Sequence, residues 1–183
     1  MLDVLHRAGA DSVAHVILAG FMGTGKTAVG RRLARRLGRG FVDTDGLIEA
    51  TAGRSVAEIF RDEGEEYFRR LEREAVAKAV TMPDAVVAVG GGALGDPQNR
   101  RQLLAAGPVV CLRATPEAIL ERVGDAKSRP LLASLSPAER LAEIRALIAA
   151  REVAYQSASH DVDTTDLSLD EVVDRVRTLV GDV

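Results

Sequence analysis

The sequence contains a single cysteine, few aromatic residues, only three lysines and no long apolar run. Cys111 is the single cysteine among 183 residues, so one chain forms neither a disulfide framework nor a cysteine metal cluster. Aromatic residues make up 3% of the chain and Trp is absent, so we expect an aliphatic core. No stretch approaches the ~20 apolar residues of a membrane span. The N-terminus lacks the basic and apolar regions of a signal peptide, so we expect a cytoplasmic protein with no membrane partner.

The remaining composition is that of a globular chain with no attraction to nucleic acid. Hydrophobic residues make up 46%, charged residues 28%, and the net charge is −3. We expect one domain over residues 1–183, monomeric, with residues 1–13 as a frayed polar extension. Arginines crowd the stretch from residue 31 to residue 39, where no aromatic residues are interleaved. We interpret them as a solvated helix face rather than a nucleic-acid patch.

Strand and helix patterns alternate along the chain. Short apolar runs typical of buried strands occupy residues 16–19, 41–42, 85–89, 109–112 and 160–162. Helical pattern covers residues 26–37 and 47–80, with a break near residues 52–53. Further helices begin at cap signals, which are Asp96-Pro97, Thr115-Pro116, Ser136-Pro137 with Glu139, and Ser168 with Glu171. This alternation predicts a three-layer α/β/α fold with a five-stranded parallel sheet, in which ligands bind beyond the carboxyl ends of the strands.

The strongest motif is the glycine-rich segment Gly20-Phe21-Met22-Gly23-Thr24-Gly25-Lys26-Thr27, which follows a strand and opens a helix. It fits G-x-x-x-x-G-K-[ST], the P-loop of nucleotide-binding proteins. Its backbone N–H groups and the helix N-terminus attract phosphate. Lys26 should reach the β- and γ-phosphates of ATP, and Thr27 should place its hydroxyl on Mg²⁺.

A GTPase is the natural alternative among P-loop proteins, because residues 43–46 also match D-x-x-G. A GTPase would carry an N-K-x-D segment that reads guanine. None of the three lysines has aspartate two residues later, so this alternative fails. A kinase of a small molecule fits the chain length better, and it needs a base and an acceptor pocket.

Asp43 and Asp45 follow a predicted strand immediately. If the segment is extended, both side chains point the same way. One can serve Mg²⁺ through water, and the other can accept a proton from an attacking hydroxyl. The triple glycine Gly90-Gly91-Gly92 also follows a strand, and it permits close backbone approach to a ligand.

Several segments together resemble the shikimate kinase family, in order from about residue 15 to the C-terminus. They are the P-loop, Phe41-Val42-Asp43-Thr44-Asp45 with Ile48-Glu49, Ile59-Phe60 with Phe68-Arg69-Arg70-Leu71-Glu72, Gly90-Gly91-Gly92-Ala93, and Arg129-Pro130-Leu131-Leu132. The resemblance implies a nucleoside-monophosphate-kinase-like fold. It also implies transfer of the ATP γ-phosphate to the 3-hydroxyl of shikimate.

The same resemblance implies a role for individual residues. Asp45 contacts the acceptor hydroxyl as the base, and Asp43 helps to hold Mg²⁺ through water. Arg69 and Arg151 grip the shikimate carboxylate. Independently of the resemblance, Glu72 lies three residues beyond Arg69, so the helical spacing places it where it can orient Arg69. Gly91 and Gly92 line the acceptor pocket. The ATP site then comprises Gly23, Thr24, Gly25, Lys26, Thr27 and Ala28, with Arg122 against adenine and Arg129 over the phosphates. Lys26, Asp45 and Arg129 are the expected catalytic residues.

Arg129 lies in a segment, residues 124–135, that lacks helical or strand periodicity. We expect this segment to be a mobile lid that closes over the phosphates, with Gly124 as a hinge.

One segment departs from the family pattern. Arg151-Glu152-Val153-Ala154-Tyr155 stands where the family has Arg-x-Pro-Leu-Tyr, which leaves the aim of Arg151 open. A kinase of another polyol or cyclic acid, such as a gluconate-type kinase, therefore remains an alternative. A catalytically silent nucleotide-binding regulator is a separate alternative, and the presence of Lys26, Thr27, Asp45 and Arg129 together argues against it.

Overall fold

The computed structural model describes residues 14–124 and 131–181. Strands and helices alternate over these ranges, as expected. In chain order they are β1 (Val16–Gly20), α1 (Lys26–Leu37), β2 (Gly40–Asp43), α2 (Thr44–Ala52), α3 (Val56–Ala79), β3 (Ala85–Ala88), the 3-10 helix η1 (Ala93–Gly95), α4 (Pro97–Ala106), β4 (Val109–Arg113), α5 (Pro116–Val123), α6 (Pro137–Tyr155), β5 (His160–Asp163) and α7 (Leu169–Val180).

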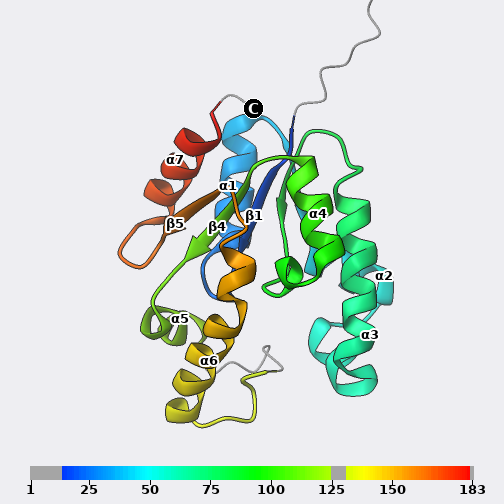
Figure 1. Ribbon diagram of the computed structural model, residues 1–183, viewed down its shortest axis with the longest axis vertical. Helices are drawn as coiled ribbons and strands as arrows, with labels where there is room; N and C mark the ends of the chain where they lie inside the picture. The colour runs from blue at the N-terminus through cyan, green and yellow to red at the C-terminus, as the bar shows by residue number, and fades with distance from the viewer. Residues whose placement is uncertain (1–13, 125–130, 182–183) are drawn as a thin grey trace, which may run out of the picture.

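The strands form one five-stranded sheet in the order β2-β3-β1-β4-β5, and all paired strands are parallel. β1 lies in the centre, where Leu18 is in register with Ala88 on one side and Val110 on the other. The predicted five-stranded parallel sheet is therefore confirmed. Its carboxyl ends point toward the lower part of Figure 1, between α3 and α6.

Alternate residues of each strand bury their side chains on opposite faces of the sheet. Val16 and Leu18 of β1 pack in a cluster with α1 and α7. Ile17 and Ala19 pack in a second cluster with α3, α4 and α6. These two helical layers enclose the sheet, which makes the three-layer α/β/α arrangement visible in Figure 1. The core is aliphatic, as the composition predicts, and Cys111 is buried within it.

The cap signals set the helix starts. Ser136 with Glu139 and Ser168 with Glu171 form capping boxes, and Asp96 and Thr115 cap α4 and α5. A third capping box, Ser55 with Glu58, starts α3. Neither this box nor the kink at Gly64, where a φ of 81° interrupts α3, was predicted from the sequence.

Part of the predicted lid and the predicted N-terminal extension cannot be compared with the structure. Residues 1–13, and residues 125–130 with Arg129, lie outside the described residues. Residues 131–134 form turns, as a loop prediction requires. Leu132 is fully buried against Phe21, Ile119 and Ile144, so this end of the segment is anchored to α5 and α6.

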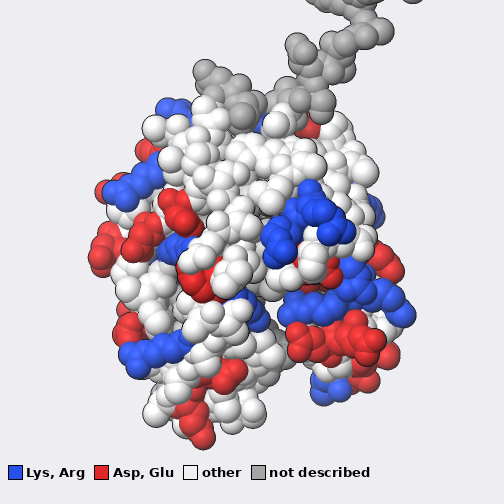
Figure 2. All heavy atoms as spheres, viewed as in Figure 1, with Lys and Arg blue, Asp and Glu red and all other residues white. Residues whose placement is uncertain are grey.

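The arginines near α1 do not share one solvated face. Arg32 and Arg36 pair with Asp170 and Asp174 of α7, whereas the Arg39 side chain is 7% exposed and donates to the Ala14 carbonyl. The interpretation as a solvated helix face is wrong for Arg39, because it packs beneath the start of β1. Figure 2 shows Lys and Arg side chains interspersed with Asp and Glu over the drawn face. Among the described residues, no helix is long and apolar enough to cross a bilayer.

Candidate active site

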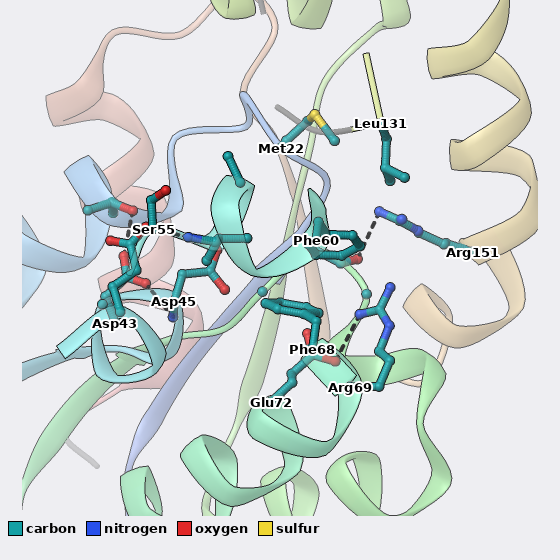
Figure 3. A pocket seen from close by; sticks show the side chains of 18 of the residues that line it. Met22, Asp43, Asp45, Ser55, Phe60, Phe68, Arg69, Glu72, Leu131 and Arg151 are labelled. Carbon is teal, nitrogen blue, oxygen red and sulfur yellow. Dashed lines mark hydrogen bonds and ion pairs between the residues drawn. The ribbon is translucent and has the colours of Figure 1, made fainter. Parts of the chain in front are cut away.

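A cavity of about 730 Å³ opens at the carboxyl ends of β1, β2 and β3. Its volume lies within the range of small-molecule sites. The segments after these strands converge there, as the fold predicts for a parallel sheet. Of the residues predicted from the sequence, those that line the cavity are Thr27, Asp43, Asp45, Arg69, Gly91, Gly92 and Arg151. Figure 3 shows several of them around the cavity.

The P-loop lies between β1 and the first turn of α1, as predicted. Lys26 is the first residue of α1, and its Nζ donates hydrogen bonds to the Gly20 and Phe21 carbonyls at 2.9 Å each. The Thr24 hydroxyl donates to the Phe21 carbonyl at 2.8 Å. These bonds hold the loop around the Lys26 ammonium. They place a positive charge at the N-terminus of α1, where the helix dipole also attracts anions.

Thr27 and Asp43 face each other across the floor of the cavity. The Thr27 hydroxyl donates to Asp43 Oδ2 at 2.8 Å. A hydroxyl beside a carboxylate offers the oxygen ligands that Mg²⁺ prefers, so these residues fit the predicted metal site. In the described part of the chain, no three His, Cys, Asp or Glu side chains gather as a metal site. Mg²⁺ usually takes few protein ligands and completes its shell with water and phosphate oxygens.

The segment from Asp43 to Asp45 is not extended, so the condition under which both side chains would point the same way is not met. β2 ends at Asp43 and α2 begins at Thr44, so Asp45 lies in a helical turn. Asp43 caps this helix by accepting the Asp45 N–H at 3.1 Å. The Asp43 carboxylate accepts a hydrogen bond from the Thr27 hydroxyl, whereas Figure 3 shows the Asp45 side chain pointing into the cavity. The two carboxylates are thus separated into different parts of the site.

Arg69 and Glu72 lie one turn apart on α3 and form an ion pair with an Nη1–Oε2 distance of 2.9 Å. Glu65, one turn earlier, accepts from Arg69 Nη2 at 2.8 Å. The two carboxylates fix the guanidinium beside the triple glycine. A Cβ on residue 92 would lie 2.5 Å from Arg69 Nη1, so any larger residue there would displace the guanidinium from this position. The predicted proximity of Glu72 to Arg69 on one helix face is confirmed.

Glu72 is buried, with 1% of its surface exposed. Among the described residues, no group hydrogen-bonds to its Oε1. Burial raises the pKa of the Glu72 carboxyl, although the Arg69 guanidinium acts in the opposite direction. A carboxyl group with a higher pKa in the folded protein destabilises the fold as pH rises from the unfolded toward the folded pKa.

We therefore expect Glu72→Gln to change the pH dependence of stability. As pH rises above 4.5, the ordinary pKa of this group, the free energy of unfolding of the variant should improve relative to wild type. Urea unfolding of both proteins between pH 4 and about 7.5 measures the difference. A difference that stays constant across this range would show that Glu72 titrates alike in the folded and unfolded chains.

Arg151 reaches the cavity from α6, on the side opposite α3. Its Nη1 donates to the Gly91 carbonyl at 3.4 Å, and its guanidinium lies 5.2 Å from the centre of the Phe21 ring. In Figure 3 the Arg69 and Arg151 side chains approach each other from different helices. The structure therefore brings together two cations that are 82 positions apart in the sequence. Both keep N–H groups near the space between them, where an anionic group can be bound bidentately.

The other two arginines predicted for the site, Arg122 and Arg129, are not among the described residues that line the cavity. Arg122 is on α5 and donates to the Gly23 carbonyl at 3.4 Å and the Thr164 carbonyl at 2.6 Å. Arg122 thereby ties the P-loop to the segment after β5. Arg129 lies outside the described residues, so its role over the phosphates stays a prediction.

Much of the cavity wall consists of residues to which the sequence alone assigned no site role. Phe60 and Phe68 of α3 line it, with ring centroids 4.6 Å apart, together with Met22 and Leu131. Aromatic residues are rare in this chain, and two of them at a spacing of eight in one helix were the available signal. Arg31, one turn after Thr27, is exposed and also lines the cavity, a contact that the interpretation as a solvated helix face does not include.

Comparison with known proteins identifies relatives over most of the chain. The family model described as shikimate kinase matches residues 22–180. A shikimate kinase of Symbiobacterium thermophilum is 51% identical over 87% of this chain and 91% of its own. One from Caldanaerobacter subterraneus subsp. tengcongensis is 46% identical over 88% of this chain and 93% of its own.

A solved structure resembles the whole described fold. It is a shikimate kinase from Acinetobacter baumannii in complex with shikimate, and it superposes with a TM-score of 0.88 at 33% sequence identity. The match covers 93% of this chain and 94% of the other.

Proposed function

The chain belongs to the shikimate kinase family, and on that premise we propose that the cavity binds shikimate beside ATP, whose γ-phosphate is transferred to the 3-hydroxyl. The products are shikimate 3-phosphate and ADP. The observation that carries this proposal is that Asp45 lines the same cavity as the P-loop residue Thr27 and the two arginines Arg69 and Arg151.

The arginines define the acceptor. Arg69 and Arg151 face one space from two helices, and a planar guanidinium pairs in a fork with a carboxylate. Phe60 and Phe68 supply an apolar wall against which the carbon ring of a cyclic acid can pack. An acceptor that carries both a carboxylate and a ring satisfies both surfaces, whereas a linear polyol acid would leave the aromatic wall without a matching face.

Asp45 is the proposed base. A bound acceptor held by its carboxylate between the arginines would place a hydroxyl between Asp45 and the P-loop. The Asp45 carboxylate accepts the proton of this hydroxyl while the oxygen forms a bond to the γ-phosphorus. The bond between the γ-phosphorus and the oxygen that bridges the β- and γ-phosphates breaks, and ADP departs with that oxygen.

The ATP site is proposed to comprise the P-loop residues Gly23, Thr24, Gly25, Lys26, Thr27 and Ala28. Lys26 stabilises charge on the phosphates as the γ-phosphoryl group moves. Arg122 would present the flat face of its guanidinium to adenine, since its N–H groups already bind carbonyls. Arg129 completes the proposal as a further cation near the phosphates.

Mg²⁺ would be held by the Thr27 hydroxyl and, through water, by Asp43. The ion neutralises phosphate charge when bound. The hydrogen bond between Thr27 and Asp43 supports this assignment, because it shows that both oxygens face one point.

We also propose that the chain acts as a monomer in the cytoplasm. Residues of one chain supply the phosphate loop, the base and both arginines, so the site needs no second copy.

A coupled assay of ADP release tests the function against its alternatives. Three reactions are compared, with shikimate, with gluconate and without acceptor, each at saturating ATP and Mg²⁺. The proposal predicts ADP release that depends on shikimate. Preference for gluconate would identify a different polyol kinase, and no acceptor-dependent release would favour a silent nucleotide-binding protein.

We expect Arg69→Ala to weaken acceptor binding far more than ATP binding. A charge-assisted hydrogen bond contributes about 1.5–3 kcal/mol. Its loss corresponds to a roughly 10- to 150-fold rise in the shikimate Kd, at about 1.4 kcal/mol per decade. Calorimetric titration with shikimate and with ADP measures both affinities. An acceptor analogue that lacks the carboxylate should erase most of the difference between the variant and wild type.

Two controls separate recognition from structural damage. Arg70→Ala removes the adjacent arginine, which lies over the Tyr67 ring rather than in the cavity, and it should leave the shikimate Kd unchanged. Arg69→Ala also leaves Glu72 buried without its cation. Adding Glu72→Gln should recover thermal stability but not acceptor affinity. If Arg69→Ala weakens the analogue and shikimate equally, Arg69 does not bind the carboxylate.

A further inference from the structure

We infer that Arg113, which lies outside the cavity, is a positioning residue that sets the aim of Arg151 through the last turn of α6. The inference rests on the proposed function of Arg151 as a ligand of the acceptor carboxylate. It concerns the segment in which Val153-Ala154 replaces the Pro-Leu of the family pattern.

Arg113 joins three elements at the end of β4. Its Nη1 donates to Glu152 of α6 at 2.6 Å, and its Nε donates to Asp161 of β5 at 2.8 Å. Its guanidinium also lies 5.7 Å from the centre of the Tyr155 ring. One cation thus holds two carboxylates and an aromatic face together, with 25% of the Arg113 side chain exposed. None of these four residues lines the cavity as described.

Tyr155 transmits this attachment to the cavity. Its side chain is buried, and its hydroxyl donates to the Gly91 carbonyl at 2.7 Å. Arg151 Nη1 donates to the same carbonyl at 3.4 Å. Residues 151 and 155 are four positions apart, so their side chains lie on one face of α6. Both therefore meet Gly91, which lines the acceptor cavity.

The two sets of contacts restrain α6 from two sides. Glu152 is the neighbour of Arg151 and points toward Arg113, whereas Arg151 and Tyr155 point toward Gly91. Rotation of the last helical turn would break the Arg113–Glu152 pair on one side or the Tyr155–Gly91 bond on the other. Without a proline in this turn, the side-chain contacts provide the restraint. A displacement of about 1 Å at a positioning residue can cost up to about 10²-fold in rate.

The ion pairs must be weighed by their exposure. Glu152 and Asp161 are 40% and 53% exposed, so each pair adds little to global stability. The ion pairs matter more for the position of α6 than for stability, because the shared guanidinium holds α6 beside β5. Arg113→Lys keeps the charge and loses this fork. Tyr155→Phe removes the hydroxyl and keeps the ring.

Steady-state kinetics of both variants tests the inference. Loss of one restraint should raise the shikimate KM roughly 3- to 10-fold, the effect of one net hydrogen bond, and leave the ATP KM within about 2-fold. Arg145→Ala is the matched control. It breaks the exposed ion pair between Arg145 of the same helix and Glu117 of α5, and it should leave both KM values unchanged. Thermal melting shows whether each variant is folded. If Arg113→Lys does not fold, the kinetics of Tyr155→Phe test the inference.

The decisive comparison repeats both substitutions in an Arg151→Ala background. There the inference predicts no further rise in the shikimate KM, because the residue being positioned is gone. An unchanged shikimate KM in the single variants, an equal rise for both substrates, or a full additional rise in the Arg151→Ala background would each overturn it. Absence of shikimate turnover by wild type would overturn the proposed function and this inference together.

Discussion

Lys26→Ala should lower kcat roughly 10²–10³-fold at saturating ATP and Mg²⁺, the range seen when one preorganised electrostatic donor is removed. Lys26 is the cation at the N-terminus of α1, and its ammonium is surrounded by P-loop carbonyls. On ATP binding it can exchange these carbonyls for phosphate oxygens. The developing charge of phosphoryl transfer would then lose its closest fixed cation in the variant.

The variant should remain folded, since Lys26 lies at the rim of the core rather than within it. Circular dichroism and thermal melting check this point. Lys78→Ala is the matched control, because Lys78 lies on the exposed surface near the end of α3. It should keep wild-type kcat. Near-normal turnover by a folded Lys26→Ala protein would contradict the P-loop assignment.

Asp45→Asn should lower kcat roughly 10²–10⁴-fold while ADP binding stays close to wild type, the usual effect of losing a positioned base. The amide keeps the shape of the side chain but cannot take up the hydroxyl proton. Asp45 lies in the first turn of α2, where its side chain faces the cavity and its N–H binds Asp43. Rapid-quench kinetics on shikimate phosphorylation, with calorimetry for ADP, separate the chemical step from binding.

Asp43→Asn provides the comparison, because the structure places Asp43 against Thr27 instead of the acceptor space. Its defect should be largest at low Mg²⁺ and should diminish as Mg²⁺ is raised. Asp45→Asn should show no such rescue. An unchanged kcat for Asp45→Asn, or recovery of its rate by Mg²⁺, would show that Asp45 is not the base.

Local sequence signals predicted the parts of this structure that depend on neighbouring residues. The glycines of the P-loop motif themselves permit the tight backbone path that the loop needs. The capping boxes at Ser136 and Ser168 set helix starts within one turn. Buried parallel strands are continuous apolar runs, so the sheet followed from residues 16–19 and their counterparts. The convergence of three post-strand segments at one edge then followed from the topology of a parallel sheet.

Features that depend on tertiary contacts could not be predicted in this way. The D-x-D pattern indicates two carboxylates but not that Thr44 begins a helix between them, which separates Asp43 from Asp45. Arginine is a residue type usually found on the surface. The burial of Arg39 depends on its contacts with Ala14 and Asp84, which are distant in the sequence. The attachment of Arg113 to Glu152 and Asp161 spans 39 and 48 positions, and no local pattern encodes such distances.

Identification of the wild-type product tests the central claim most directly. The protein is incubated with ATP, Mg²⁺ and shikimate, and the product is examined by mass spectrometry and by phosphorus–proton correlation NMR. We predict one phosphate added per shikimate, on the oxygen of carbon 3, with an equal amount of ADP. ADP without phosphorylated shikimate, or a phosphate on another hydroxyl, would contradict the assignment of this cavity as the site of shikimate 3-phosphorylation.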